Sequence, residues 1–226
     1  MKNSLLYLYC VLTLCCVFGA CEKDNYDPPK SMLTGKVVYN GQPVGVRNNG
    51  VQLELWQYGF GTFISIPVNV AQDGTFSSEL FDGDYKLVRK VRNGPWADNT
   101  DSIDIKLRGS TSIDVPVDPF FLVKNEKYAV NGNTLTATFN IEKINQTGAF
   151  DEVIMCLGKT IIVDRNNLDG LAWKTNRDIT DLTQTITLTT TIPPALMSQK
   201  YFYIRLAANA QGANERAYTQ SFKFTL

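Results

Sequence analysis

The sequence predicts an all-β protein that is built from two β-sandwich domains. From about residue 32 to the C-terminus, short runs alternate apolar and polar residues with a period of two, which is the pattern of half-buried strands. Gly, Asn, Asp and Pro residues separate these runs and are typical of turns. Residues 32–117 contain no convincing amphipathic helix, and 226 residues are enough for about two domains with cores of their own.

Residues 1–20 have the pattern of a cleaved signal peptide. Lys2 supplies the positive charge, and the apolar run from Leu5 to Phe18 is 14 residues long, which is too short for a membrane span of about 20 residues. The run leads into FGAC (residues 18–21), which resembles a bacterial lipobox. The resemblance implies that the thiol of Cys21 is acylated and anchors the protein to a membrane. An ordinary secretory signal followed by an incidental cysteine is the alternative.

Residues 21–31 form a polar segment, CEKDNYDPPKS, that contains nothing to bury. The segment therefore predicts a tether between the lipid and the first domain. Its EKD triplet (22–24) resembles the signal that sends lipoproteins of Bacteroidetes to the outer face of the outer membrane. The resemblance implies a lipid-anchored protein in the outer membrane that faces the cell exterior.

The first domain is expected at residues 32–118. Its predicted strands are Leu33–Tyr39, Val51–Tyr58, Phe63–Val70, Thr75–Leu80, Tyr85–Val91, Ser102–Leu107 and Ser112–Val117. Glycine after Asp73 supplies a tight turn before the strand of Phe76. The segments LTGKVVYNGQPVGV, VQLEL, QDGTFSSELFDGDYKLV, IDIKL and STSIDVPV, in this order, resemble the carboxypeptidase-regulatory-like domain. The resemblance implies a transthyretin-like sandwich that serves as a non-catalytic module.

The second domain is expected at residues 119–226, after a junction at Pro116–Phe121 where two prolines interrupt the strand pattern. An apolar pair, Phe120 and Phe121, is expected to dock between the domains. The predicted strands include Thr134–Phe139, Glu152–Leu157, Thr160–Val163 and Thr185–Ile192. The closing stretch YFYIRLAANAQGANERAYTQSFKFTL resembles the last two strands of fibronectin type III domains, which implies an Ig/FnIII-like sandwich.

Composition argues against nucleic-acid binding and against an enzyme. Lys plus Arg equals Asp plus Glu at 22 each, so no net basic charge attracts phosphate groups. Histidine, the commonest general base and zinc ligand, is absent. We therefore expect no catalytic residues, no metal site and no cofactor. After processing, Cys156 is the one cysteine left in the folded body, and its apolar neighbours VIMCL indicate a structural role.

Two motifs with a catalytic or metal-binding appearance have simpler explanations. The acidic pairs Asp82 with Asp84 and Asp101 with Asp104 are of the kind that glycoside hydrolysis uses, but they fall in turns or at strand edges. The loop DRNNLDG (164–170) resembles a calcium loop, yet Leu168 stands where a third oxygen ligand is needed. A hairpin loop is the favoured interpretation of this second motif.

Aromatic side chains give a candidate binding site. If Val51, Leu53 and Leu55 face the core, a period of two places Trp56 and Tyr58 on the opposite, exposed face. Such rings stack on the C–H face of a sugar, and neighbouring polar side chains bind its hydroxyls. Trp96 is expected to extend this surface. Packing against the other domain or against a partner protein is the alternative explanation for all three rings.

Taken as a whole, the chain resembles lipoproteins of Bacteroidetes that accompany SusC/SusD-type glycan uptake systems. The resemblance implies a non-catalytic surface protein that binds glycan or assists assembly of the uptake complex, with SusC/SusD-type outer-membrane proteins as partners. A structural or adhesive module, such as a fimbria-like subunit without a glycan ligand, is the alternative. For that alternative a donor strand or a pro-segment would be expected, and the polar tether at residues 22–31 shows neither.

Overall fold

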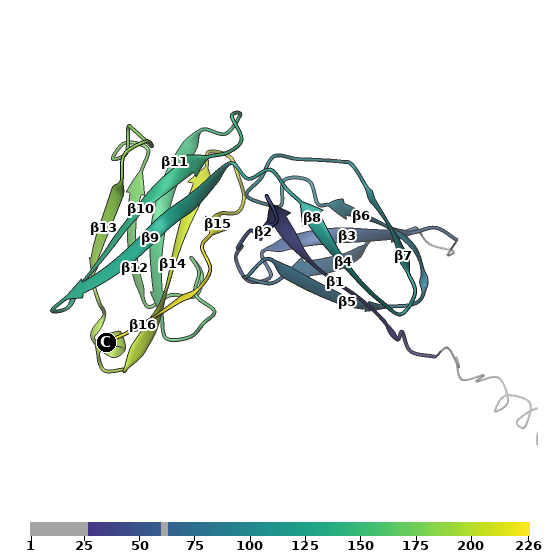
Figure 1. The fold of residues 1–226 in the computed structure, drawn as a ribbon, viewed down its shortest axis with the longest axis horizontal. Helices are drawn as coiled ribbons and strands as arrows, with labels where there is room; N and C mark the ends of the chain where they lie inside the picture. The colour runs from purple at the N-terminus through teal and green to yellow at the C-terminus, as the bar shows by residue number, and fades with distance from the viewer. Residues whose placement is uncertain (1–26, 60–62) are drawn as a thin grey trace, which may run out of the picture.

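The computed structural model describes residues 27–59 and 63–226, which form two β-sandwich domains side by side (Figure 1). The predicted signal peptide, Cys21 and the tether up to residue 26 lie outside the described residues. Strand β8 of the first domain ends at Pro116, and strand β9 of the second domain begins at Phe121. The prediction of an all-β fold with two sandwiches is confirmed.

The first domain consists of one sheet that folds back on itself. Its strands are β1 (Ser31–Tyr39), β2 (Gln42–Pro43), β3 (Val51–Gln57), β4 (Ile66–Val70), β5 (Thr75–Leu80), β6 (Gly83–Arg89), β7 (Ile103–Leu107) and β8 (Ser110–Pro116). The order is β2-β1-β5-β4-β3-β6-β7, and β8 pairs with β1 in parallel. A single residue pair, Val70 with Phe76, joins β4 to β5, so the sheet bends there.

Alternation along the strands builds the first core. On β3, Val51, Leu53 and Leu55 are fully buried, whereas the residues between them reach the outer face. The turn before β5 needs Gly74, whose φ of 88° lies in the left-handed region that favours glycine. The sequence pattern therefore predicts correctly which face of β3 is buried.

The second domain is a sandwich of two separate sheets. Its elements are β9 (Phe121–Asn131), β10 (Thr134–Lys143), β11 (Phe150–Gly158), β12 (Gly170–Thr175), β13 (Ile186–Thr191), α2 (Pro194–Met197), β14 (Tyr201–Ala210), β15 (Ala217–Tyr218) and β16 (Phe222–Thr225). One sheet has the order β13-β10-β9, and the other has the order β12-β11-β14-β15, with β16 also paired to β14. Alternate residues of β10 and β14, such as Leu135, Phe139, Phe202 and Leu206, fill the core between them.

Some predicted strand boundaries are wrong. Thr160–Val163 is not a strand: Val163 packs over Cys156 on the outside of β11, and Ile161 is exposed. The predicted strand Phe63–Val70 begins only at Ile66. Strands β9 and β12 were not expected, because the C-terminal half of β9 is largely exposed and β12 is a short strand with one buried residue, Ala172.

Candidate functional site

Three aromatic side chains gather near the end of the first domain that lies away from the second domain. Trp56 is half-buried on the outer face of β3, and Tyr58, just after the strand, is 68% exposed. Phe63 approaches both from the far side of the loop: its ring centroid lies 4.8 Å from that of Tyr58 and 4.9 Å from that of Trp56. We call these three rings the aromatic platform.

Polar side chains continue the surface across the neighbouring strands. Strand pairing places Trp56 opposite Lys86 and Lys86 opposite Asp104, so the three residues form one row over β3, β6 and β7. Lys86 donates a hydrogen bond to Asp104 over 2.6 Å, and this bond raises the pKa of the lysine ammonium. The row therefore combines an aromatic ring with a charged donor and a charged acceptor.

A shallow groove lies over the polar part of this row, at Lys86 and Asp104, and Trp56 is not part of its lining. Its volume is about 220 Å³, and its lining includes Tyr58, Asp84, Lys86, Asp104 and Lys106. Asp84 also accepts a hydrogen bond from Arg108 over 3.1 Å. The two ion pairs are exposed, so their members can exchange partners with a ligand at little cost.

The expectation that Trp96 extends this surface is wrong. Trp96 is only 4% exposed and belongs to the buried core of the first domain. Its ring lies against Gly94, where a Cβ atom would come within 2.2 Å of the indole. The visible edge of Trp96 lines a different cavity, of about 160 Å³, beside Phe120 and Asn214. Burial against the junction between the domains removes Trp96 from the aromatic platform.

Phe63 is the platform residue that the sequence pattern missed as a site residue. It lies 51% exposed in a segment that precedes β4, and no period of two relates it to Trp56. The glycines on both sides of Phe60 were a signal for a turn that brings the two strands together. Trp173 is another exposed tryptophan, at 59%, on β12 of the second domain.

The opposite end of the first domain is covered by the second domain. Tyr218 of β15 donates its N–H to the carbonyl of Gly45 over 2.8 Å, and its neighbour Ala217 packs into the first-domain core. A Cβ atom at Gly45 would lie 2.5 Å from the Tyr218 carbonyl oxygen, so only glycine fits this contact. Backbone pairing and core packing therefore both cross the domain boundary.

A fully buried arginine lies at the centre of this domain interface. Arg205 of β14 donates to the carbonyl oxygens of Thr219 over 2.8 Å, Gln72 over 2.9 Å and Val46 over 3.2 Å. Its guanidinium also lies 4.5 Å from the centre of the Tyr218 ring. Burial lowers the pKa of Arg205 to about 10, so the side chain remains charged at neutral pH.

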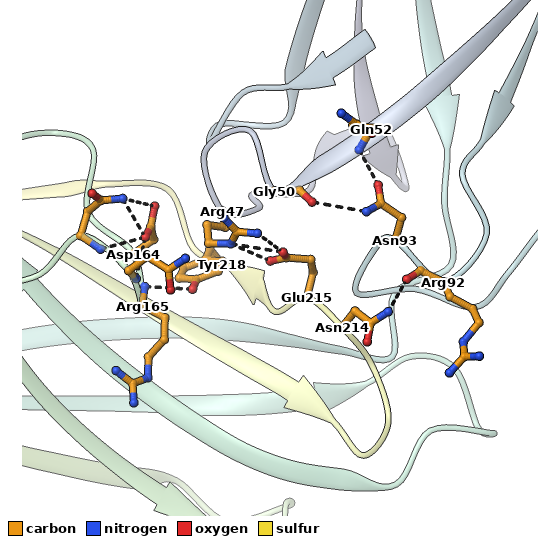
Figure 2. A network of polar contacts seen from close by, with 12 residues as sticks. Arg47, Gly50, Gln52, Arg92, Asn93, Asp164, Arg165, Asn214, Glu215 and Tyr218 are labelled. Carbon is orange, nitrogen blue, oxygen red and sulfur yellow. Dashed lines mark hydrogen bonds and ion pairs between the residues drawn. The ribbon is translucent and has the colours of Figure 1, made fainter. Parts of the chain in front are cut away.

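Further polar contacts cross the interface between the domains (Figure 2). Arg47 of the first domain forms an ion pair with Glu215 of the second, and Asn214 donates to the Arg92 carbonyl over 2.7 Å. On another side Gln72 donates to the carbonyl of Ile161 over 2.8 Å. These bonds hold the two domains in one relative orientation.

The candidate acids have structural partners. Asp82 accepts hydrogen bonds from Ser31 and from the N–H of Gly109, and Asp84 and Asp104 are paired with cations as described above. In the loop 164–170, buried Asp164 accepts bonds from the backbone of Asn166 and Asn167 within the β11–β12 connection. The prediction of a hairpin loop there is confirmed.

Cys156 is fully buried, and burial raises the pKa of its thiol to about 12. The thiol is therefore protonated and shielded at neutral pH, as a structural residue would be. The described part of the chain contains no group of three or more His, Cys, Asp or Glu side chains suited to a metal ion. Within residues 27–59 and 63–226, no helix is long and apolar enough to cross a membrane.

Both domains match models of one protein family. Residues 31–118 match "Protein of unknown function (DUF3823) N-terminal domain", and residues 121–223 match "Domain of unknown function (DUF3823_C)". The chain belongs to the DUF3823 family. No curated protein matches it significantly.

Solved DUF3823 structures share the whole architecture. A family member from Bacteroides ovatus is 39% identical, with a TM-score of 0.80 over 87% of this chain and 100% of the other. A second, from Parabacteroides merdae, is 32% identical, with a TM-score of 0.81 over 88% and 100%. A Bacteroides uniformis protein described as a "putative carbohydrate binding protein" is 20% identical, with a TM-score of 0.70 over 88% and 100%, and this similarity shows the fold alone.

Proposed function

We propose that this protein is a non-catalytic, lipid-anchored component of the outer membrane that binds glycan on the aromatic platform and serves SusC/SusD-type uptake. The observation that carries the proposal is the row of Trp56, Lys86 and Asp104 beside the exposed ring of Tyr58. Aromatic rings cover the apolar C–H face of a pyranose, and the ammonium and carboxylate supply a donor and an acceptor for its hydroxyls.

The shape and charge of the surface indicate an extended, neutral glycan. The groove is shallow and open, which suits a chain that lies across it rather than a small molecule that is enclosed. Two positive and two negative side chains line it, Lys86 and Lys106 with Asp84 and Asp104, so the groove carries no excess of either charge. A uronic acid or a sulfated sugar is negatively charged and would need an excess of positive charge in the groove.

Anchoring through Cys21 is the second part of the proposal and has its own test. The signal sequence ends in FGAC, and the apolar run is too short to remain as a span. A Cys21→Ala variant should accumulate as unprocessed or soluble protein, as measured by fractionation and by the mass of the mature chain. Correctly processed variant protein that stays on membranes in high salt would contradict lipid anchoring.

Glycan binding is tested by native electrophoresis in gels that contain a neutral α-glucan, β-glucan, xylan, mannan or fructan. We expect one of these polysaccharides to retard the protein. Trp56→Ala should then weaken binding about fivefold, since loss of ring stacking costs on the order of 1 kcal/mol. The thermal midpoint should change little, because Trp56 is only half-buried.

A matched control is available in the second domain. Trp173 is also an exposed tryptophan on a strand, so Trp173→Ala removes the same chemical group far from the platform. This variant should bind like the wild type. Equal loss of retardation in both variants would contradict the assignment of the platform. Absence of retardation in every gel would instead favour a structural or adhesive module.

A further inference from the structure

The end of the first domain away from the second domain, which we call the distal end, carries three apolar side chains beyond the aromatic platform. Ile64 is 66% exposed, Phe81 is 47% exposed and Met32 is 37% exposed. They come from three separate segments: the approach to β4, the β5–β6 turn and the start of β1. We call these residues the apolar tip. Of the exposed large apolar side chains in the described part of this domain, only Val91 lies outside the tip and the platform.

Pairing brings the three segments to the same end. Met32 lies opposite Glu79 on β5, and Phe81 follows directly after that strand. Strand β4 runs antiparallel to β5 but pairs with it only at Val70 and Phe76, so the start of β4 and the end of β5 both lie at the distal end, on opposite sides of the bend in the sheet. Ile64 lies just before that start. The apolar tip therefore combines residues that the sequence separates widely.

Hydrogen bonds hold the turns beneath the tip. Asp82 accepts bonds from the Ser31 hydroxyl and, over 2.9 Å, from the N–H of Gly109. The Tyr85 hydroxyl donates to the carbonyl of Phe81 over 2.8 Å. Three chain segments are thus tied together at the base of the tip, which fixes the positions from which Met32 and Phe81 project into solvent.

The described chain also enters the fold at this end (Figure 1). Strand β1 begins at Ser31, ten positions after Cys21 in the sequence. A chain of ten residues spans at most about 35 Å. If Cys21 carries the lipid, the distal end is held within that distance of the bilayer, and the second domain lies on the far side of the first.

We propose that the apolar tip docks into the interfacial layer of the lipid bilayer and fixes the orientation of the protein on the membrane. This inference rests on the proposed lipid anchoring. Apolar side chains that project from turns enter the boundary between headgroups and acyl chains, while neighbouring charges stay among the headgroups. Lys30, Arg108 and Asp84 provide such charges around the tip.

Docking in this way leaves the row of Trp56, Lys86 and Asp104 accessible. The row of Trp56, Lys86 and Asp104 lies on the outer face of β3, β6 and β7, along the side of the domain, whereas the tip residues extend from its end. The charges of both signs near the tip give no net attraction to anionic lipid. Docking therefore depends on apolar contact and should resist salt.

The experiment uses a soluble form that begins at residue 22, with an N-terminal histidine tag that holds it on protein-free phosphatidylcholine vesicles bearing a nickel-chelating lipid. The tag replaces acylation, so the result does not depend on the chemistry of Cys21 or on glycan. An environment-sensitive dye is attached to single cysteines introduced by Ile64→Cys, Phe81→Cys or Ile161→Cys. The native thiol at Cys156 is buried and stays unlabelled.

We expect dye emission at positions 64 and 81 to shift to the blue on vesicles and to be quenched by lipids brominated in their acyl chains. The shift should persist in 0.5 M salt, where the screening length falls to roughly 4 Å. Position 161, exposed in the second domain, should show no change. No change at 64 and 81, or an equal change at 161, would overturn the proposal.

A second experiment tests the tip residues with a dye that is attached next to the tip rather than on it. A dye at position 108, introduced by Arg108→Cys, lies beside the tip and should also shift on vesicles. The pair Ile64→Ser with Phe81→Ser should abolish that shift, while circular dichroism remains unchanged because both side chains are exposed. If the dyes respond only on native membranes that contain proteins, the partner is a membrane protein and the lipid proposal is wrong.

Discussion

The two ends of the first domain differ in which side chains they carry and in how far these are buried. At the interface with the second domain, buried Arg205 donates to carbonyl groups from both domains, and Gly45 pairs with Tyr218. At the distal end, aromatic and aliphatic side chains from several turns project into solvent. The interface end is therefore buried and its polar groups are hydrogen-bonded, whereas the distal end is exposed and rich in apolar groups.

This difference indicates where a ligand or a membrane can bind. Polar groups at the interface already have partners, so a new ligand there would have to break existing hydrogen bonds. Apolar groups at the distal end lose nothing when they are covered, since burial removes their surface from water. Function is therefore expected at the end where the fold leaves apolar surface exposed.

The largest expected effect is at Arg205. Arg205→Ala should lower the free energy of unfolding by about 4–5 kcal/mol, because it empties a large buried volume and leaves several buried carbonyls without a donor. Urea unfolding followed by tryptophan fluorescence measures this loss. Arg177→Ala, at an exposed position of the second domain, is the control and should change stability by less than about 0.5 kcal/mol. Similar losses in the two variants would contradict the central role of Arg205.

Truncation of one tryptophan at each end compares how much the two ends contribute to stability. Trp96→Ala at the junction should cost about 3–5 kcal/mol, as truncation of a buried aromatic residue usually does. Trp56→Ala on the platform should cost about 1 kcal/mol, because much of its surface stays in water. Thermal unfolding of both variants measures the difference. A loss at Trp56 as large as that at Trp96 would show that the platform is part of a core.

A smaller loss of stability is expected from a methyl group at Gly45. Gly45→Ala places a methyl group against the Tyr218 carbonyl and should cost about 1–3 kcal/mol. Because the strain acts between the domains, we expect one calorimetric transition for the wild type and two for this variant. Gly132→Ala is a control that strains a turn with φ of 62° and open space around it, so the transition should move without splitting. An unsplit, unshifted transition for Gly45→Ala would show that the interface adapts.

The stability of the first domain on its own tests how much the interface with the second domain contributes. A fragment of residues 32–118 lacks Ala217, which fills part of its core, and lacks the donors of Arg205. We expect the fragment to fold but to melt well below the intact chain. A fragment as stable as the whole would show that the interface contributes little to the first domain.

The smallest expected effect concerns Cys156. Its folded pKa of about 12 lies above the ordinary value of 9.0, so the thiol favours the folded state below about pH 9 and that contribution is lost as the pH rises toward 12. The native protein should not react with a thiol reagent at pH 8, whereas the unfolded protein should. Between pH 8 and pH 10.5, the wild type should lose more stability than Cys156→Ala. Rapid labelling of the native thiol would contradict its burial.

Several features of this protein follow from its sequence alone. Period-two alternation between turn residues predicts the all-β class, and the alternation of Val51, Leu53 and Leu55 predicts which face of β3 is buried. Such patterns are local, because a strand needs only its own residues to define two faces. Edge strands such as β12 escape this method, because β12 is short and buries only Ala172 among its six residues.

Tertiary structure decided which exposed-looking side chains are covered. The sequence predicts that Trp56 and Trp96 are both exposed, yet Trp96 is buried at the junction while Trp56 contacts Phe63 at the surface. Arg205 lies on the outer face of its own sheet and is buried because the first domain covers it, where the carbonyl of Val46, 159 residues away, accepts its hydrogen bond. A local pattern determines the two faces of a strand, but only the packing of distant segments determines whether the outer face meets water, another domain or a ligand.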